Sequence, residues 1–219
     1  MSQLVFKFPF KTKYYEQDYY VSSNNFSAYR LIESWPNWPD KCVNIFGPTG
    51  CGKTHLSNIL KKKMSTAEII EAKNVNDESL LKLKKFECVI IDNYNGNIKE
   101  RLLYSIINES KQLDNYIVIN SKSPIKDIKY KLQDLKSRAN SFVDLGIELP
   151  TDDLLRVIIT KYFSDKQIKI TPKISEYIIK NIERSYEKAF KFIKKIDDLS
   201  LSSGKSININ LIKKVLINE

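Results

Sequence analysis

The fold of this chain is decided by one short stretch, Gly47-Pro48-Thr49-Gly50-Cys51-Gly52-Lys53-Thr54, which matches the pattern G-x-x-x-x-G-K-[ST] in full. A run rich in β-formers, 42–46, precedes it, and a helical pattern follows to about Lys63. The glycines allow backbone N–H groups to close around phosphate oxygens, and the start of the helix adds the positive end of its dipole. Because strand, loop and helix occur in register, the stretch predicts a phosphate-binding loop rather than a chance match in a tight turn.

The side chains at the end of this loop and after a second strand carry the predicted chemistry. Lys53 is expected to reach the β- and γ-phosphates of a nucleotide, and the Thr54 hydroxyl is expected to ligate Mg²⁺. Asp92 follows the apolar run 86–91, where an acid can hold the water shell of that ion; a helix-capping aspartate is the alternative. Asn93 comes next. An amide can orient water but cannot take its proton, so we expect slow hydrolysis by this chain alone.

The wider chain reads as an α/β domain followed by helices. Five runs favour strands and alternate with helical segments: 42–46, 68–70, 86–91, 116–119 and 143–145. This alternation predicts a parallel five-stranded sheet between helices, two of which are expected from the polar cluster 22–25 to about Trp35 and over 98–112. After Pro150 helices are expected at 152–164, 172–181, 183–201 and 207–216. We predict an α/β nucleotide-binding domain over 21–155 and a small all-helical domain over 156–219.

The charge balance of the chain is strongly basic. Among its 219 residues, 36 Lys and Arg face 26 Asp and Glu, which gives a net charge of +10. Such a charge can indicate a nucleic-acid partner. Only five of the basic residues are arginine, however, and a chain rich in Lys, Ile and Asn is also what an AT-rich genome encodes. Both interpretations stay open on composition alone.

Cysteine usage and hydropathy restrict the compartment. Three cysteines and a single histidine exclude zinc sites of the usual ligand spacing and fit a reducing environment. No apolar run approaches the roughly 20 residues that a membrane-spanning helix needs. Lysines interrupt the apolar residues of the N-terminus, which argues against a signal peptide. We therefore expect a cytoplasmic protein with no membrane partner.

Arginines are informative in a chain whose default cation is lysine, because the planar guanidinium fork matches phosphate. Arg138 lies beyond the run 116–119, and Arg184 lies at the start of a predicted helix in the second domain. Each is a candidate phosphate contact, and a surface ion pair is the alternative. Asn120 ends the run 116–119 and either reaches the γ-phosphate side of the site or forms a turn.

The loop, Asp92, Asn120, Arg138 and Arg184 occur in the order used by the AAA+ ATPases, and within them the chain resembles the DnaA family of bacterial replication proteins. The segment 19–25, Tyr-Tyr-Val-Ser-Ser-Asn-Asn, is similar to the segment that wraps the adenine in that family. The resemblance implies an AAA+ P-loop NTPase fold with a helical lid, and ADP or ATP with Mg²⁺ as ligands. The implied nucleotide contacts are Tyr20, Val21, Pro48, Thr49, Gly50, Cys51, Gly52, Lys53, Thr54, His55, Asn120 and Arg184.

Two further segments extend the resemblance to catalytic roles. The segment 134–138, Asp-Leu-Lys-Ser-Arg, is similar to the arginine-finger box of the family, which implies that Arg138 acts in trans on a neighbour's nucleotide. Asp92 and Asn93 are the other residues with implied catalytic roles, and Thr54 and Asp92 are the implied Mg²⁺ ligands. The segment 184–189, Arg-Ser-Tyr-Glu-Lys-Ala, resembles the sensor-2 segment, which implies that Arg184 contacts the phosphates and sets the angle of the lid.

The two ends of the chain resemble the Hda group of DnaA-related regulators. The chain ends at residue 219, just after the expected lid, and we expect it to lack the domain with which DnaA binds DNA boxes. The segments 35–39, 92–93 and 182–185 also look like this group. Residues 1–20 are expected to form a clamp-binding peptide and its linker, because the segment 3–10 is similar to the peptide Gln-Leu-x-Leu/Phe. The implied contacts with the sliding clamp are Gln3, Leu4, Phe6 and Phe8.

For this N-terminal segment the alternative is a strand folded onto the chain's own core. The spacing also leaves open which of Phe6, Phe8 and Phe10 is the anchor.

The resemblance implies a negative regulator of replication initiation. It would bind its own nucleotide, dock on the DNA-loaded sliding clamp (the beta subunit of the polymerase), and stimulate ATP hydrolysis by DnaA through the finger in trans. Its partners would be DnaA and the clamp, with DNA reached indirectly through the clamp, and a homo-oligomer is possible. The alternatives are a DNA-binding replication-initiation or helicase-loader AAA+ ATPase and a self-sufficient ATPase; we expect weak intrinsic hydrolysis.

Overall fold

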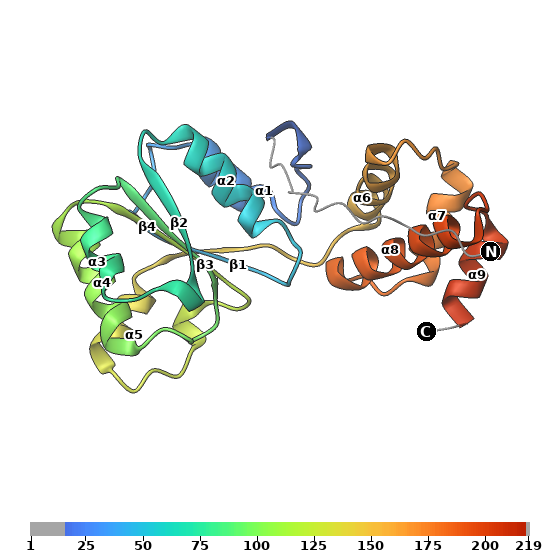
Figure 1. Ribbon diagram of the computed structural model, residues 1–219. Coiled ribbons are helices and arrows are strands. Elements are labelled where there is room, and N and C mark those ends of the chain that lie inside the picture. Colours follow the sequence, from blue (N-terminus) through green and yellow to red (C-terminus); the bar gives the residue numbers. More distant parts are fainter. Residues whose placement is uncertain (1–15, 218–219) are drawn as a thin grey trace. The chain divides into compact units, whose positions relative to one another are not determined.

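The computed structural model describes residues 16–217, which fall into two compact units, 16–148 and 149–217 (Figure 1). The expected clamp-binding residues Gln3, Leu4, Phe6 and Phe8 lie outside the described residues.

The first unit is built on one parallel sheet. Its strands are β1 (Cys42–Phe46), β2 (Ala67–Glu71), β3 (Cys88–Tyr94), β4 (Tyr116–Ser121) and β5 (Val143–Gly146), in the order β2-β3-β4-β1-β5. Every neighbouring pair is parallel. The helices of this unit are α1 (Phe26–Glu33), α2 (Lys53–Lys63), α3 (Glu78–Leu83), α4 (Glu100–Gln112) and α5 (Gln133–Asn140), with short 3-10 turns at Glu16–Asp18, Ala72–Asn74 and Ile125–Asp127. The predicted five-stranded parallel sheet between helices is confirmed.

Helices cover both faces of the sheet because its central strands are apolar on both faces. Helices α1 and α2 lie on one face, and α3, α4 and α5 lie on the other (Figure 1). Successive side chains of a strand point to opposite faces. Val89, Ile91, Ile117 and Ile119 belong to the buried cluster that includes Leu103, Ile107 and Leu135 of the second helix layer. Ile90 and Val118 are equally buried, and the alternation of side chains places them on the opposite face, which α1 and α2 cover. The sheet is therefore held by two apolar layers.

Several element bounds differ from the sequence prediction. Strand β3 continues to Tyr94, so that Asp92 and Asn93 lie inside the strand rather than after it. The ladder between β3 and β4 shifts register between Ile91 and Tyr94, and Asn93 has φ 58°. Asparagine tolerates this left-handed conformation better than most residues. The strand therefore bulges at the residue that follows Asp92.

Two helices of the first unit were not predicted. Helices α3 and α5 have six and eight residues, which is too short for a clear apolar period. Helix α1 ends at Glu33, two residues before the expected Trp35. Near this end, the Trp38 indole donates to the Leu31 carbonyl at 2.7 Å and packs edge-on against Tyr116.

The second unit contains four helices, α6 (Asp152–Asp165), α7 (Pro172–Asn181), α8 (Tyr186–Ser203) and α9 (Ile209–Ile217). The first three begin at hydroxyl N-caps, since Thr151, Thr171 and Ser185 each accept from a backbone N–H three residues on. Gly204, with φ 62°, ends α8 in the left-handed conformation. The predicted all-helical architecture of this part is confirmed. Within 16–217, none of the helices is long and apolar enough to cross a membrane.

Asn44 provides a test of how β1 is joined to β4 and to the 3-10 turn after β4. This side chain is fully buried; its amide nitrogen donates to the Ile119 carbonyl at 2.8 Å, and its amide oxygen accepts from the Ile125 N–H at 3.0 Å. Asn44→Ala leaves both backbone groups without these partners, and we expect it to destabilise this unit by about 3 kcal/mol. Urea unfolding followed by tryptophan fluorescence checks this, since both tryptophans lie in the first unit.

The exposed Asn95→Ala is the matched control and should leave the urea midpoint unchanged. If Asn44→Ala has the same urea midpoint as the parent chain, the two hydrogen bonds of Asn44 do not stabilise this unit as stated.

Candidate nucleotide site

The glycine loop joins β1 to α2 at the carboxyl edge of the sheet. Gly50 has φ 83° and Gly52 has φ 99°, values that favour glycine. A Cβ atom at Gly47 would lie 2.5 Å from the Ile147 carbonyl oxygen, and one at Gly52 would lie 2.9 Å from the Tyr19 ring. The backbone therefore approaches its neighbours so closely that glycine is required at both ends of the loop.

Lys53 is held inside this loop. Its ammonium donates to the carbonyl oxygens of Gly47 at 2.7 Å and Pro48 at 3.0 Å, and the residue is only 8% exposed. The Cys51 sulfur lies 3.6 Å from the same nitrogen. Burial raises the pKa of the Cys51 thiol, and the charge of Lys53 acts in the opposite direction. A buried ammonium beside an array of backbone N–H groups is an arrangement suited to phosphate.

Asp92 connects the loop helix to the neighbouring strands. One carboxylate oxygen accepts from the Thr54 hydroxyl at 2.7 Å, and the other accepts from the Asn120 amide at 2.8 Å. Asn120 also donates to the Ser57 hydroxyl at 2.7 Å. The Asn120 amide oxygen is buried and has no hydrogen-bond partner within 16–217. The structure thus places Asn120 in a buried network with Asp92 and not in a turn.

The oxygen donors at this point fit Mg²⁺. Thr54 and Asp92 bring a hydroxyl and a carboxylate to within 2.7 Å of each other next to the phosphate loop. Hard cations of this size bind oxygen and commonly use only one or two protein ligands, with phosphate oxygens and water completing the shell. These two side chains would therefore hold the ion.

Hydrogen bonds within the segment fix the turn that is expected to contact adenine. Asn25 accepts from the Ser22 N–H at 2.8 Å and donates to the Tyr20 carbonyl at 2.9 Å, which fixes the turn that contains Val21. Tyr20 is 44% exposed. This turn is therefore held by its own asparagine and leaves the Tyr20 ring accessible.

Tyr19 belongs to the segment expected to wrap the adenine but is not among the expected nucleotide contacts. Its ring stacks on Tyr29 with centroids 5.8 Å apart and meets His55 edge-on at 5.3 Å. The same ring covers Gly52, so Tyr19 lies over the end of the phosphate loop. An aromatic residue in the segment that resembles an adenine-wrapping element could have suggested it, but which of two adjacent tyrosines packs inward is decided by tertiary contacts.

Glu71 was also missed. It ends β2 directly opposite Asp92 in the ladder, and both of its carboxylate oxygens lie 3.2 Å from the side-chain nitrogen of Asn93. An acid at the carboxyl end of a predicted parallel strand is a signal that could have found it. The edge of the sheet therefore carries two carboxylates, Asp92 buried and Glu71 half-buried.

Arg138 lies near the amino ends of the strands, whereas the phosphate loop lies at their carboxyl ends. It is near the end of α5, five residues before Val143, which pairs with Val43 at the start of β1. Burial raises the pKa of Cys42, the first residue of β1, to about 11, and the nearby charges of Lys111 and Arg138 oppose this rise. Strand β1 spans about 13 Å between the two edges. Arg138 and the phosphate loop of the same chain therefore belong to different sides of the unit.

Arg184 lies in the second unit and forms a two-pronged ion pair. Its guanidinium donates to the two carboxylate oxygens of Asp152, at 2.9 Å and 3.1 Å. The hydrogen bond from Arg184 lowers the pKa of the Asp152 carboxyl. Both side chains are exposed. The structure thus gives Arg184 an acidic partner on the first turn of α6.

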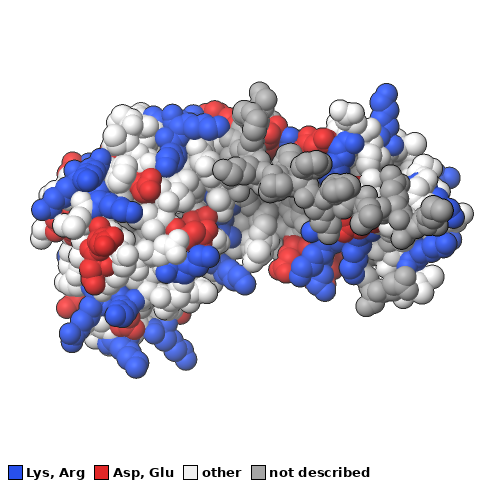
Figure 2. Space-filling view, viewed as in Figure 1, with Lys and Arg blue, Asp and Glu red and all other residues white. Residues whose placement is uncertain are grey.

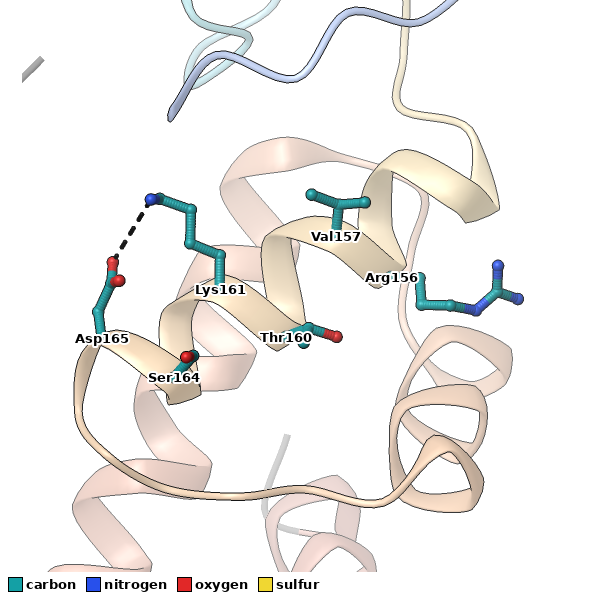
Figure 3. A pocket seen from close by; sticks show the side chains of 6 residues that line it. All are labelled: Arg156, Val157, Thr160, Lys161, Ser164 and Asp165. Atoms are coloured by element: carbon teal, nitrogen blue, oxygen red, sulfur yellow. Dashed lines mark ion pairs between the residues drawn. The ribbon is translucent and has the colours of Figure 1, made fainter. Parts of the chain in front are cut away.

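A hollow on the second unit contains none of the predicted site residues (Figure 3). One face of α6 lines it, with side chains of mixed character: Arg156, Val157, Thr160, Lys161, Ser164 and Asp165. Figure 3 shows Lys161 reaching toward Asp165, an exposed pair 4.0 Å apart. This surface therefore adds nothing to the candidate site.

Gly52 provides the direct test of the loop. In Gly52→Ala the new methyl group would meet the Tyr19 ring in a left-handed backbone, and we expect affinity for ADP to fall by at least about tenfold, or 1.4 kcal/mol. Titration with a fluorescent ADP analogue measures the change.

Gly204→Ala is the matched control, because Gly204 is also left-handed but a Cβ there meets nothing within 4 Å. It should bind ADP like the parent chain. Equal affinity in Gly52→Ala would contradict the role given to the loop.

Comparison with known proteins gives a consistent result at low identity. No protein-family model matches the chain. The chromosomal replication initiator protein DnaA of Buchnera aphidicola subsp. Cinara cedri is 23% identical over 87% of this chain and 48% of its own length. The chain spans about half the length of the curated relatives it matches.

Solved structures show the fold. Domain III of the Thermotoga maritima replication initiation protein DnaA superimposes with a TM-score of 0.78 at 18% identity, covering 96% of this chain and 98% of that one. A replication initiator DnaA bound to AMPPCP and single-stranded DNA gives a TM-score of 0.68 at 19% identity, covering 89% and 67%. The chain has an AAA+ P-loop NTPase fold, and both its sequence and its fold are similar to the AAA+ domain of the replication initiator DnaA.

Proposed function

We propose that this chain is a nucleotide-binding regulator of DnaA, of the Hda type, that presents Arg138 to ATP held by DnaA and so promotes its hydrolysis. The observation that carries the proposal is the position of Arg138. It lies at the sheet edge opposite the chain's own phosphate loop, and its guanidinium has no hydrogen-bond or ion-pair partner among residues 16–217. A guanidinium placed in this way is suited to a neighbour's nucleotide.

The chemistry of such a finger is electrostatic. Negative charge shifts onto the phosphate oxygens as the γ-phosphate leaves, and a guanidinium fork stabilises that charge. In other NTPases this contribution is worth about 10³ to 10⁵ in rate. Lysine cannot replace it fully, since an ammonium is a point charge without the planar fork. The product on DnaA would be ADP, and the chain would act as a negative regulator of initiation.

The chain's own site would hold ADP or ATP as a structural ligand. Lys53 and the loop N–H groups bind the phosphates, and Thr54 with Asp92 would hold Mg²⁺, which supplies charge neutralisation when bound. Asn93 stands where a second carboxylate would take a proton from water. This supports weak intrinsic hydrolysis. Arg184, in the helical unit, would give up its ion pair with Asp152 and contact the phosphates of this nucleotide.

Docking on the DNA-loaded clamp rests on the sequence of the N-terminus. Gln3 and Leu4, with one or two of Phe6, Phe8 and Phe10, match the clamp-binding peptide to which this segment is similar. Such docking would place the chain beside DnaA on DNA in the bacterial cytoplasm without direct contact with DNA. Arg138 could equally contact a nucleotide held by a second copy of this chain, so self-association through the same surface is compatible with the proposal.

The second candidate is a DNA-binding initiation or helicase-loader ATPase. It is favoured by the net charge of +10 and by the DnaA structure of similar fold that is bound to single-stranded DNA. Against it, Figure 2 shows basic side chains spread over both units with acidic ones among them, rather than gathered in one stripe on that face.

Arg138→Ala tests the proposed finger. We expect it to keep the chain's own ADP affinity, because the residue is remote from the loop, and to lower the stimulation of DnaA–ATP turnover by at least about 10³-fold. ADP formation is followed in a mixture of DnaA–ATP, clamp, DNA and the variant. Lys136→Ala removes an exposed cation from the same helix; it is the matched control and should stimulate normally. Full stimulation by Arg138→Ala would show that another group acts as the finger.

The N-terminal peptide is tested by the double change Gln3→Ala with Leu4→Ala. Loss of the polar contact and of one apolar anchor should abolish retention of the chain on immobilised clamp. Lys11→Ala with Lys13→Ala removes charge nearby without touching the motif and should be retained. Unchanged retention of the Gln3→Ala, Leu4→Ala variant would show that this peptide does not bind the clamp.

A further inference from the structure

The carboxyl edge of β2 and β3 holds a pair of side chains whose role the proposed function leaves unexplained. Glu71 ends β2 in register with Asp92, and its two carboxylate oxygens are each 3.2 Å from the Asn93 amide nitrogen. Asn93 is exposed and sits at the bulge of β3 with φ 58°. The pair lies one residue from the carboxylate that bonds Thr54 of the loop helix.

The Glu71 carboxylate determines which way the Asn93 amide faces. A carboxylate only accepts hydrogen bonds, so the amide must turn its NH₂ group toward Glu71. This leaves the amide oxygen on the other side as the acceptor that Asn93 presents. The Asn93 backbone N–H donates to Asp92 at 3.1 Å, which fixes the main chain of the same residue. Both the backbone and the side-chain orientation of Asn93 are therefore set by acids.

An amide oxygen presented at this edge is suited to holding a water molecule. In other nucleotide hydrolases an amide side chain orients the attacking water without accepting its proton. During hydrolysis the water oxygen bonds to the γ-phosphorus, and the bond from that phosphorus to the β,γ-bridging oxygen breaks with its electron pair left on ADP. The proton of the water leaves on inorganic phosphate. The amide contributes orientation only, and it does so when it is held with its oxygen outward.

We propose that Glu71 is a positioning residue for the slow ATP hydrolysis of this chain, acting through Asn93. The proposal rests on the proposed nucleotide site. It goes beyond that site because it names the group that orients the Asn93 amide toward water, at a position where a carboxylate would act as a base. Asp92 cannot serve in its place, since its oxygens are taken by Thr54, Asn120 and the Asn93 N–H.

The experiment measures single-turnover hydrolysis of labelled ATP by the full chain over hours, with ATP affinity measured separately. Glu71→Ala should lower the rate constant about tenfold, the equivalent of one hydrogen bond to a charged group, with ATP affinity within about twofold of the parent. Glu71→Gln keeps a carbonyl acceptor for the amide and should retain a rate within about threefold of the parent. Glu68→Ala, on the same strand but paired with Lys61, is the matched control and should leave the rate unchanged.

A second arm separates positioning through Asn93 from a direct effect of Glu71. Asn93→Gly removes the amide and suits the left-handed backbone. In that background Glu71→Ala should cause no further loss of rate, because the group it positions is absent.

Four outcomes would overturn the proposal. These are a parent rate for Glu71→Ala, a further loss in the Asn93→Gly background, a loss in Glu71→Gln as large as in Glu71→Ala, and a parent chain that hydrolyses ATP no faster than Lys53→Ala. If ATP affinity is normal in any of these cases, the proposed nucleotide site is still supported although the role of Glu71 is not. The stimulation of DnaA is measured in a separate reaction and is tested independently.

Discussion

The buried carboxylate of Asp92 is the group on which the rest of the site depends. It accepts hydrogen bonds from Thr54 at the start of α2, from Asn120 in β4, and from the backbone of Asn93 in its own strand. A buried charge is costly unless its oxygens are satisfied, so these donors are held in place with it. The loop helix and two strands therefore meet at one point of the sheet edge, and the phosphate loop and Glu71 are arranged around it.

The parallel sheet then separates two functional sides. The loop and the acids lie where the strands end, and Arg138 lies where β1 and β5 begin. A domain of this kind can hold one nucleotide at its carboxyl edge while offering an arginine to another. The proposed structural role of a bound nucleotide and the proposed trans role of the arginine are thus compatible in one small unit, as the proposed regulator of a related ATPase requires.

The sequence predicted the features that are set locally. The loop and the apolar run of β3 follow from short patterns, and both agree with the structure. Side-chain partners across strands could not be predicted. Glu71 meets Asn93 only because β2 pairs with β3 in a particular register and β3 bulges at Asn93. Tyr19 faces the loop through stacking on Tyr29, a contact that no local pattern specifies.

The most direct test of the central claim is a cross-linking measurement. DnaA is loaded with an ATP analogue that carries a photoreactive group on its γ-phosphate, mixed with this chain and clamp-bearing DNA, and irradiated. The account predicts that the label is recovered on peptides of this chain that contain α5 and Arg138. Labelling confined to the phosphate loop of this chain, or the absence of label from α5, would contradict it.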